Sequence, residues 1–148
     1  LKQRGLPEST LHIIGANPTP RLITAAARFG ENVTFTGFVE NPTALLCSAQ
    51  AFVAPVYYGT GIKTKILDAM AYRVPVVTTP QGAEGLDIRH GEEVMLAQDD
   101  TAFAEACIEL ILTPRLRNHI RTEALHYVQR HHSEEALRET FLRICRLR

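Results

Sequence analysis

The segment 55–79, "PVYYGTGIKTKILDAMAYRVPVVTT", decides the fold class of this 148-residue chain. It starts at the end of an apolar run and passes through two glycines and two lysines. It then continues with apolar residues at helical spacing and ends in a second apolar run. This order predicts a strand, a loop, a helix and a second strand. Because parallel neighbouring strands need such a crossover connection, the segment is typical of an α/β fold with a parallel sheet.

The same alternation of β-rich runs and helical patterns continues along the chain. We predict strands at 11–16, 33–38, 51–56, 75–79 and 93–98. We predict helices at about 20–29, 41–49, 62–73 and 100–112, and two more at 114–131 and 134–147. The expected architecture is a single domain over 1–148, a Rossmann-like parallel sheet of about five strands flanked by helices. The C-terminal helices of 114–148 are expected to pack on one side of the sheet.

Charge and hydropathy exclude two classes of protein. Sixteen Lys and Arg balance sixteen Asp and Glu, so no global basic field is available to hold nucleic acid. No apolar run approaches the roughly 20 residues that a membrane-spanning helix needs. Any site for an anion must therefore be local.

The cysteines and histidines do not indicate a metal site. Cys47, Cys107 and Cys145 are far apart and lie in apolar helical patterns, so we predict buried free thiols in a reducing compartment, which favours the cytoplasm. None of them has metal-ligand spacing. The pair at 131–132 is interpreted as a solvated helix end.

The glycine-rich part of the opening segment has the chemistry of a phosphate cradle. Gly59 and Gly61 allow a close backbone approach, and the helix that follows offers free N–H groups and a positive dipole end. Lys63 and Lys65 add positive charge, and Asp68 lies on the same helical face, where it can accept hydrogen bonds from sugar hydroxyls. The alternative is an ordinary glycine turn followed by a surface ion pair between Lys65 and Asp68.

Three short motifs carry a resemblance to a known family. They are "LDAMA" at 67–71, "VPVV" at 74–77 and "PQGAEGLD" at 80–87. Together with the glycine-rich loop they resemble the C-terminal donor-binding domain of retaining GT-B-fold glycosyltransferases of the group 1, or family 4, type. The segments "LHIIGA", "VTFTGFVEN" and "LLCSAQAFVAPV" follow in the family's order, so the resemblance covers about 9–113.

The resemblance implies a hexosyltransferase whose donor is a nucleotide-diphosphate sugar. Gly59, Thr60 and Gly61 would pass beneath the diphosphate, and Lys63 or Lys65 would neutralise its charge as the sugar leaves. The resemblance implies no enzymic nucleophile, no cofactor and no metal, because lysines and the helix dipole take over the metal's role.

The resemblance also assigns the sugar and the base to particular residues. Asp68 stands where the family has the glutamate that holds the ribose hydroxyls. The backbone near Phe38 and Val39 would meet the base. The sugar or the phosphates would be approached by Gly82, Ala83 and Glu84.

The chain departs from the family pattern at several positions. Thr60 replaces a first glutamate, Asp68 is shorter than the usual glutamate, and Arg73 replaces a glycine. The family's first strand and helix of this domain and its N-terminal acceptor domain have no counterpart in the sequence. We therefore expect a domain truncated at its amino terminus that transfers no sugar alone, with the acceptor domain of the same polypeptide as its partner. Strands 11–16 and 51–56 are then predicted to pair directly, giving the order 3-2-4-5-6 by the family's count.

Two other functions remain open from the sequence. One is a sugar-nucleotide epimerase of the same fold, and the other is a non-catalytic nucleotide-binding or interaction module. The donor base, the sugar, the acceptor and the membrane association of the full-length protein also remain open.

Overall fold

The computed structural model describes residues 6 and 8–146, and for residue 146 only the backbone. The chain forms two compact units, Leu1–Leu45 and Leu46–Arg148. Each unit has its own sheet. The single domain over 1–148 stays a prediction.

Unit 1 contains a pair of parallel strands and a helix. β1 (Leu11–Ile14) pairs with β2 (Val33–Gly37), and the connection contains α1 (Pro20–Ala27) and a short 3-10 turn, η2 (Gly30–Asn32). The side-chain oxygen of Thr19 accepts a hydrogen bond from the N–H of Leu22 at 3.3 Å, so α1 begins with a normal N-cap. α2 (Thr43–Ser48) spans the boundary between the units.

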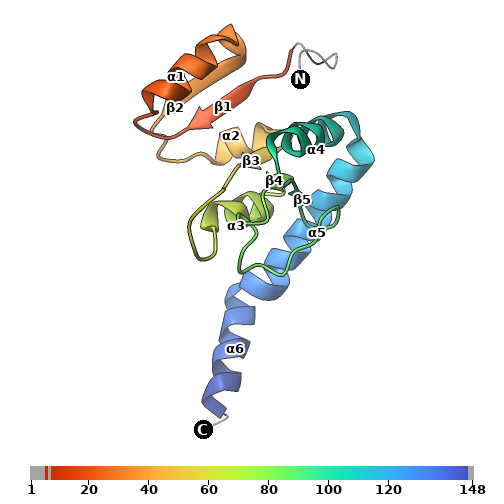
Figure 1. Ribbon diagram of the computed structural model, residues 1–148. Helices are drawn as coiled ribbons and strands as arrows, with labels where there is room; N and C mark the ends of the chain where they lie inside the picture. The colour runs from red at the N-terminus through yellow and green to blue at the C-terminus, as the bar shows by residue number, and fades with distance from the viewer. Residues whose placement is uncertain (1–5, 7, 147–148) are drawn as a thin grey trace. The chain divides into compact units, whose positions relative to one another are not determined.

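Unit 2 is a three-stranded parallel sheet with helices around it (Figure 1). Its strands are β3 (Phe52–Ala54), β4 (Val76–Thr78) and β5 (Met95–Leu96), in the spatial order β3-β4-β5. Its complete helices are α3 (Thr64–Ala71), α4 (Asp100–Leu112), α5 (Pro114–His132) and α6 (Glu134–Arg146).

The central strand β4 divides the apolar interior of unit 2 into two cores. Val76 lies in a core that α3 and α5 complete with Met70 and Ala124. Val77, the next residue, belongs to the other core, with Leu110 of α4. This alternation follows from the two-residue period of a strand, because successive side chains point to opposite faces of the sheet. β4 is therefore buried on both sides, as parallel central strands are.

All five predicted strands and all six predicted helices are present. β1 and β2 form the sheet of unit 1, and β3, β4 and β5 form the sheet of unit 2. By the family's count, the 3-2 and 4-5-6 parts of the predicted order are found. The direct pairing of 11–16 with 51–56 stays a prediction.

α3 ends in a Schellman motif that places Arg73 in the left-handed region. Its φ is 59°. The N–H of Arg73 bonds to the carbonyl of Met70 at 3.0 Å, and the N–H of Val74 bonds to that of Ala69 at 2.9 Å. The Arg73 carbonyl accepts a further hydrogen bond from Nε of Arg121 at 2.7 Å. The backbone therefore adopts the conformation that the family's glycine favours, although the residue is arginine.

The two C-terminal helices differ in their packing. α5 contributes buried Ile120, Ala124 and Tyr127 to the interior, as predicted. α6 begins as expected at the N-cap Ser133, whose hydroxyl accepts the N–H of Ala136 at 3.1 Å. Its apolar side chains are exposed, with 66% of Phe141 accessible, and none of its described side chains is buried. The expected packing of this helix on the sheet is therefore not seen.

The prediction of buried cysteines is correct only in part. All three are free thiols, but Cys47 and Cys145 are exposed. The apolar pattern around each of them predicted a helix correctly but did not show whether the thiol is covered. Only Cys107 is largely covered, and burial raises the pKa of its thiol to about 11. Within the described residues, no helix is long and apolar enough to cross a bilayer.

Candidate functional site

The glycine-rich loop follows β3 and leads into α3. Gly59 and Gly61 have φ angles of 104° and 78°, in a region that side-chain-bearing residues rarely adopt. A Cβ at either position would meet nothing within 4 Å, so the backbone conformation rather than crowding requires glycine there. The loop is exposed from Tyr57 to Ile62. The predicted glycine turn is therefore present at the carboxyl end of a parallel strand, where α/β folds bind ligands.

The charged residues lie at the start of α3. Lys63 is the N-cap residue, makes no side-chain capping bond, and donates from its Nζ to the carbonyl of Gly61. Lys65 and Asp68 are exposed. The structure shows no ion pair between these two described side chains, so the simple surface pair that was the alternative interpretation is not formed. Lys65 and Asp68 are therefore accessible to a ligand.

The second loop follows β4 and contains the other predicted residues. Gly82 and Ala83 are buried, and both N–H groups bond within the loop, to Thr79 Oγ1 and Thr79 O, each at 3.1 Å. Glu84 is exposed. The loop is thus a compact turn, and of the three residues predicted to approach the sugar only Glu84 presents an accessible side chain.

Direct contacts join the two loops. The hydroxyl of Thr79 donates to the carbonyl of Val56. Nε2 of Gln81 donates to the carbonyl of Gly59 at 2.8 Å and to Oε2 of Glu84 at 2.7 Å. The Cγ1 atom of Ile62 lies 3.2 Å from the position of a Cβ at Gly85. The structure therefore brings the predicted residues 59–63 and 82–84 together in unit 2.

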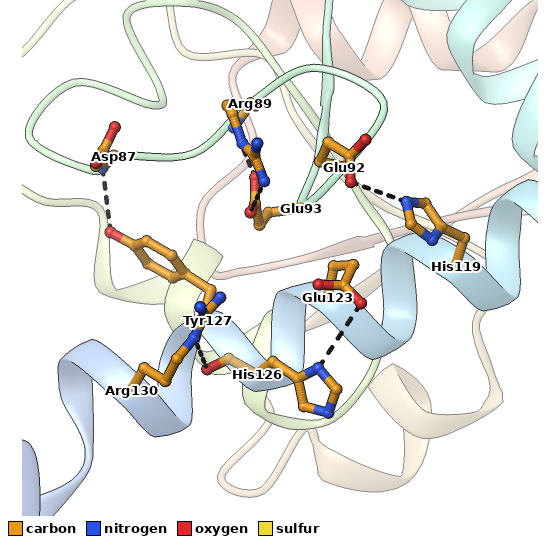
Figure 2. Close-up of polar contacts among 9 residues, drawn as sticks. All are labelled: Asp87, Arg89, Glu92, Glu93, His119, Glu123, His126, Tyr127 and Arg130. Atoms are coloured by element: carbon orange, nitrogen blue, oxygen red, sulfur yellow. Dashed lines mark hydrogen bonds and ion pairs between the residues drawn. The ribbon is translucent and has the colours of Figure 1, made fainter.

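Each loop is also anchored to a helix. The hydroxyl of Tyr57 donates to Oδ1 of Asp100 in α4 at 2.8 Å, and this hydrogen bond is the main reason why the pKa of Tyr57 is raised. At the end of the second loop, the hydroxyl of Tyr127 in α5 accepts the N–H of Asp87 at 3.1 Å (Figure 2). Helices outside the site thus hold both loops in place.

A short turn after the second loop is held by charged groups (Figure 2). The carboxylate of Glu93 accepts the N–H of Arg89 at 2.9 Å and its guanidinium at 3.0 Å. Burial alone would raise the pKa of Glu93, but these bonds and the charge of Arg89 lower it below its ordinary value. Glu92 pairs with His119 of α5 at 3.0 Å.

The predicted base-contacting residues follow β2 in unit 1. Gly37 has a φ of 70°, and Phe38 is 79% exposed while Val39 is half-buried. Both residues lie directly after the carboxyl end of a parallel strand, which is the position that the prediction required. Their contact with a base stays a prediction.

Sequence reasoning missed Gln81. Its interactions connect loops 22 residues apart along the chain, and the local pattern marks it only as a polar residue in a turn. The exposed Tyr57 was also missed, although an aromatic residue beside a glycine-rich loop is a visible signal.

Comparison with known proteins establishes the family. Residues 1–113 match the family described as "Glycosyl transferases group 1". The chain belongs to this family. It is also 42% identical over 57 residues to an uncharacterized 44.6 kDa protein in the cps region of Klebsiella pneumoniae. That stretch is 38% of this chain and only 15% of the relative.

Several solved structures have a similar fold. TarM of S. aureus, in a complex that includes UDP, has a TM-score of 0.81 and 18% identity, covering 95% of this chain and 29% of TarM. Anabaena HepE, in complex with UDP and glucose, has a TM-score of 0.79 and 18% identity, covering 98% of this chain and 43% of HepE. The C-terminal domain of the Francisella tularensis protein LpcC has a TM-score of 0.71 and 23% identity, covering 85% of this chain and 71% of that domain. The predicted α/β fold of a C-terminal GT-B domain is confirmed.

Proposed function

We propose that this chain is the donor-binding part of a retaining glycosyltransferase and binds a nucleotide-diphosphate sugar, with UDP as the nucleotide. One observation carries the proposal. The positive-φ loop at Gly59 and Gly61 leads directly into a helix that begins with Lys63, beside the accessible Lys65 and Asp68. UDP is chosen because TarM and HepE were crystallised with it.

The proposed chemistry uses charge at the leaving group. When the bond between the anomeric carbon and the β-phosphate oxygen breaks, negative charge grows on the diphosphate. Lys63, Lys65 and the dipole of α3 would stabilise that charge, and no metal is needed in this proposal. Thr60 and the backbone of Gly59 and Gly61 would lie beneath the diphosphate. Asp68 would accept hydrogen bonds from the ribose hydroxyls.

The remaining contacts in the proposal come from the other loops. The backbone near Phe38 and Val39 would meet the base. Glu84 would approach the sugar, with Gly82 and Ala83 shaping the turn that carries it. The acceptor would bind to another domain of the same polypeptide, and the free thiols are compatible with a cytoplasmic location.

The proposal is tested by NMR titration of the ¹⁵N-labelled chain with UDP, GDP and ADP. UDP is expected to shift the amides of 59–65. Lys63→Ala and Asp68→Ala are each expected to weaken binding about five- to thirtyfold, which corresponds to about 1–2 kcal/mol for a hydrogen bond to a charged group at an exposed site. Arg138→Ala removes one charge from the exposed face of α6 and serves as the control. The proposal fails if no nucleotide shifts these amides at millimolar concentration while the chain is folded.

A non-catalytic nucleotide-binding module is the second candidate. It is favoured by Thr60, which has no carboxylate at the position where the resemblance implies a first glutamate. Both candidates bind nucleotide, but only the transferase releases UDP from UDP-sugar in the presence of an acceptor. The 148-residue chain alone is expected to show no turnover, so the assay requires a longer polypeptide that includes an acceptor domain.

A further inference from the structure

The amide group of Gln81 joins the two loops of the candidate site through a single nitrogen. Nε2 lies 2.8 Å from the carbonyl oxygen of Gly59 and 2.7 Å from Oε2 of Glu84. Both partners are acceptors, and a primary amide nitrogen carries two N–H donors. Gln81 can therefore satisfy both acceptors at once, which also determines the orientation of its amide.

We propose that Gln81 is a positioning residue that holds the glycine-rich loop in the conformation that receives a diphosphate; the ligand in this inference rests on the proposed function. Gly59 has a φ of 104°, and glycine loses more conformational freedom on ordering than any other residue. The loop is exposed around it, so few packing contacts restrict it. The bond from Gln81 to the Gly59 carbonyl restricts this part of the loop before any ligand arrives.

The second loop provides a rigid base for Gln81. Its turn is closed by the N–H of Gly82 on Thr79 Oγ1 at 3.1 Å, and by the N–H of Leu86 on the carbonyl of Ala83 at 3.0 Å. Glu84 then selects the side-chain conformation of Gln81 by accepting its second N–H. Glu84 therefore acts on the glycine-rich loop through Gln81.

Preorganisation of this kind acts on affinity rather than on global stability. A loop already held in its bound conformation loses less entropy when the ligand binds. Gln81→Ala is expected to weaken UDP binding about two- to tenfold, the range for one net hydrogen bond. Because Gln81 is only half-buried and belongs to neither core, the thermal midpoint is expected to stay within about 2 °C of wild type.

Charge-swap variants separate the two hydrogen bonds of Gln81. Gln81→Glu removes both donors and is expected to match or exceed the effect of Gln81→Ala. Glu84→Gln retains an acceptor for Gln81, so the order parameters of the ligand-free amides at 59–61 are expected to stay close to those of wild type. The double variant Gln81→Glu with Glu84→Gln can rebuild the bond between 81 and 84, but it leaves the Gly59 carbonyl without its donor. It is therefore expected to stay as defective as Gln81→Glu alone.

Two measurements test the inference on the full 148-residue chain. The first is ligand-free: ¹⁵N relaxation order parameters of the amides at 59–61 are expected to fall below about 0.6 in Gln81→Ala, the range of flexible backbone. The second is the Kd for UDP. Unchanged order parameters in Gln81→Ala, or full recovery in the double variant, would overturn the inference. If wild type binds no UDP, the proposed function fails, but the ligand-free measurement still decides the role of Gln81.

Discussion

Gly82→Ala tests whether the second loop is as tightly packed as it is in the structure. A Cβ at Gly82 would lie 2.0 Å from Oγ1 of Thr78 and 3.3 Å from the carbonyl oxygen of Thr79. Thr78 is fully buried, and its hydroxyl donates to the carbonyl of Ala54 at 2.9 Å. The hydroxyl must therefore move, which breaks a buried hydrogen bond between β4 and β3.

The magnitude follows from these contacts. The Ala54 carbonyl still accepts the N–H of Val56 at 2.9 Å, so the group that loses its partner is the buried hydroxyl of Thr78. Leaving a buried polar group unsatisfied costs about 1–3 kcal/mol, and overpacking a core typically costs about 1–3 kcal/mol. Replacing a glycine at an ordinary φ stabilises the fold by about 0.4–1 kcal/mol, because the unfolded chain then has less conformational entropy. The free energy of unfolding is therefore expected to fall by about 2–4 kcal/mol in Gly82→Ala.

Urea unfolding of a double-mutant cycle provides the assay. Thr78→Ala removes the clashing hydroxyl, so Gly82→Ala in that background is expected to cost less than about 1 kcal/mol, with a coupling of at least about 1.5 kcal/mol. Gly91→Ala is the control for backbone strain alone, because Gly91 has a φ of 79° and no atom within 4 Å of its Cβ position. An equal cost of Gly82→Ala in both backgrounds would refute the reasoning.

Three further predictions concern stability and reactivity. The pKa of Glu93 is lowered in the folded state, so its contribution is present above the unfolded pKa near 4.3 and is lost as the pH falls through the lower folded pKa. Glu93→Gln is therefore expected to lower the free energy of unfolding by about 1–2 kcal/mol at pH 7, measured by urea unfolding. A difference between wild type and variant that does not narrow toward pH 3 would contradict this. Cys107, with a pKa of about 11, is expected to react with iodoacetamide at pH 8 at least about tenfold more slowly than the exposed Cys47, and mass spectrometry of single-cysteine variants measures the ratio. Ile120→Ala is expected to lower the free energy of unfolding by about 2–5 kcal/mol, because Ile120 is fully buried. Leu137 is 60% exposed, so Leu137→Ala is expected to change it by no more than about 0.5 kcal/mol. Similar costs for the two variants would show that α6 is covered in solution.

Periodicity predicted the elements of unit 2 well because each of them is defined by local signals. β4 is a continuous apolar run, and α4 and α5 begin at clear starts, with Asp99 as an N-cap and Pro114 in the first turn. Positions of this kind depend on neighbours within a few residues, so a single sequence contains the information.

Features that depend on distant partners were not predictable in the same way. The apolar spacing of α6 indicates an amphipathic helix, but a pattern does not say what covers its face. The role of Gln81 was not predictable for the same reason, because its contact with Gly59 forms only when the two loops come together in the fold.

The glycine loop lies between these cases. Gly59 and Gly61 were correctly assigned to a turn because their residue type has a direct conformational meaning. The ligand-binding role predicted for Lys65 and Asp68 rests on the family resemblance. The residue spacing by itself favoured an ion pair, which these described side chains do not form.

At Arg73 the backbone keeps the left-handed conformation of a helix C-terminus although the residue is not glycine. A non-glycine residue in the left-handed region costs roughly 1–2 kcal/mol, yet both bonds of the motif and the contact from Arg121 are intact. Replacing Arg73 by glycine would therefore remove this conformational cost and raise the free energy of unfolding. In directed evolution this position is a first site at which to offset destabilising changes elsewhere in the domain.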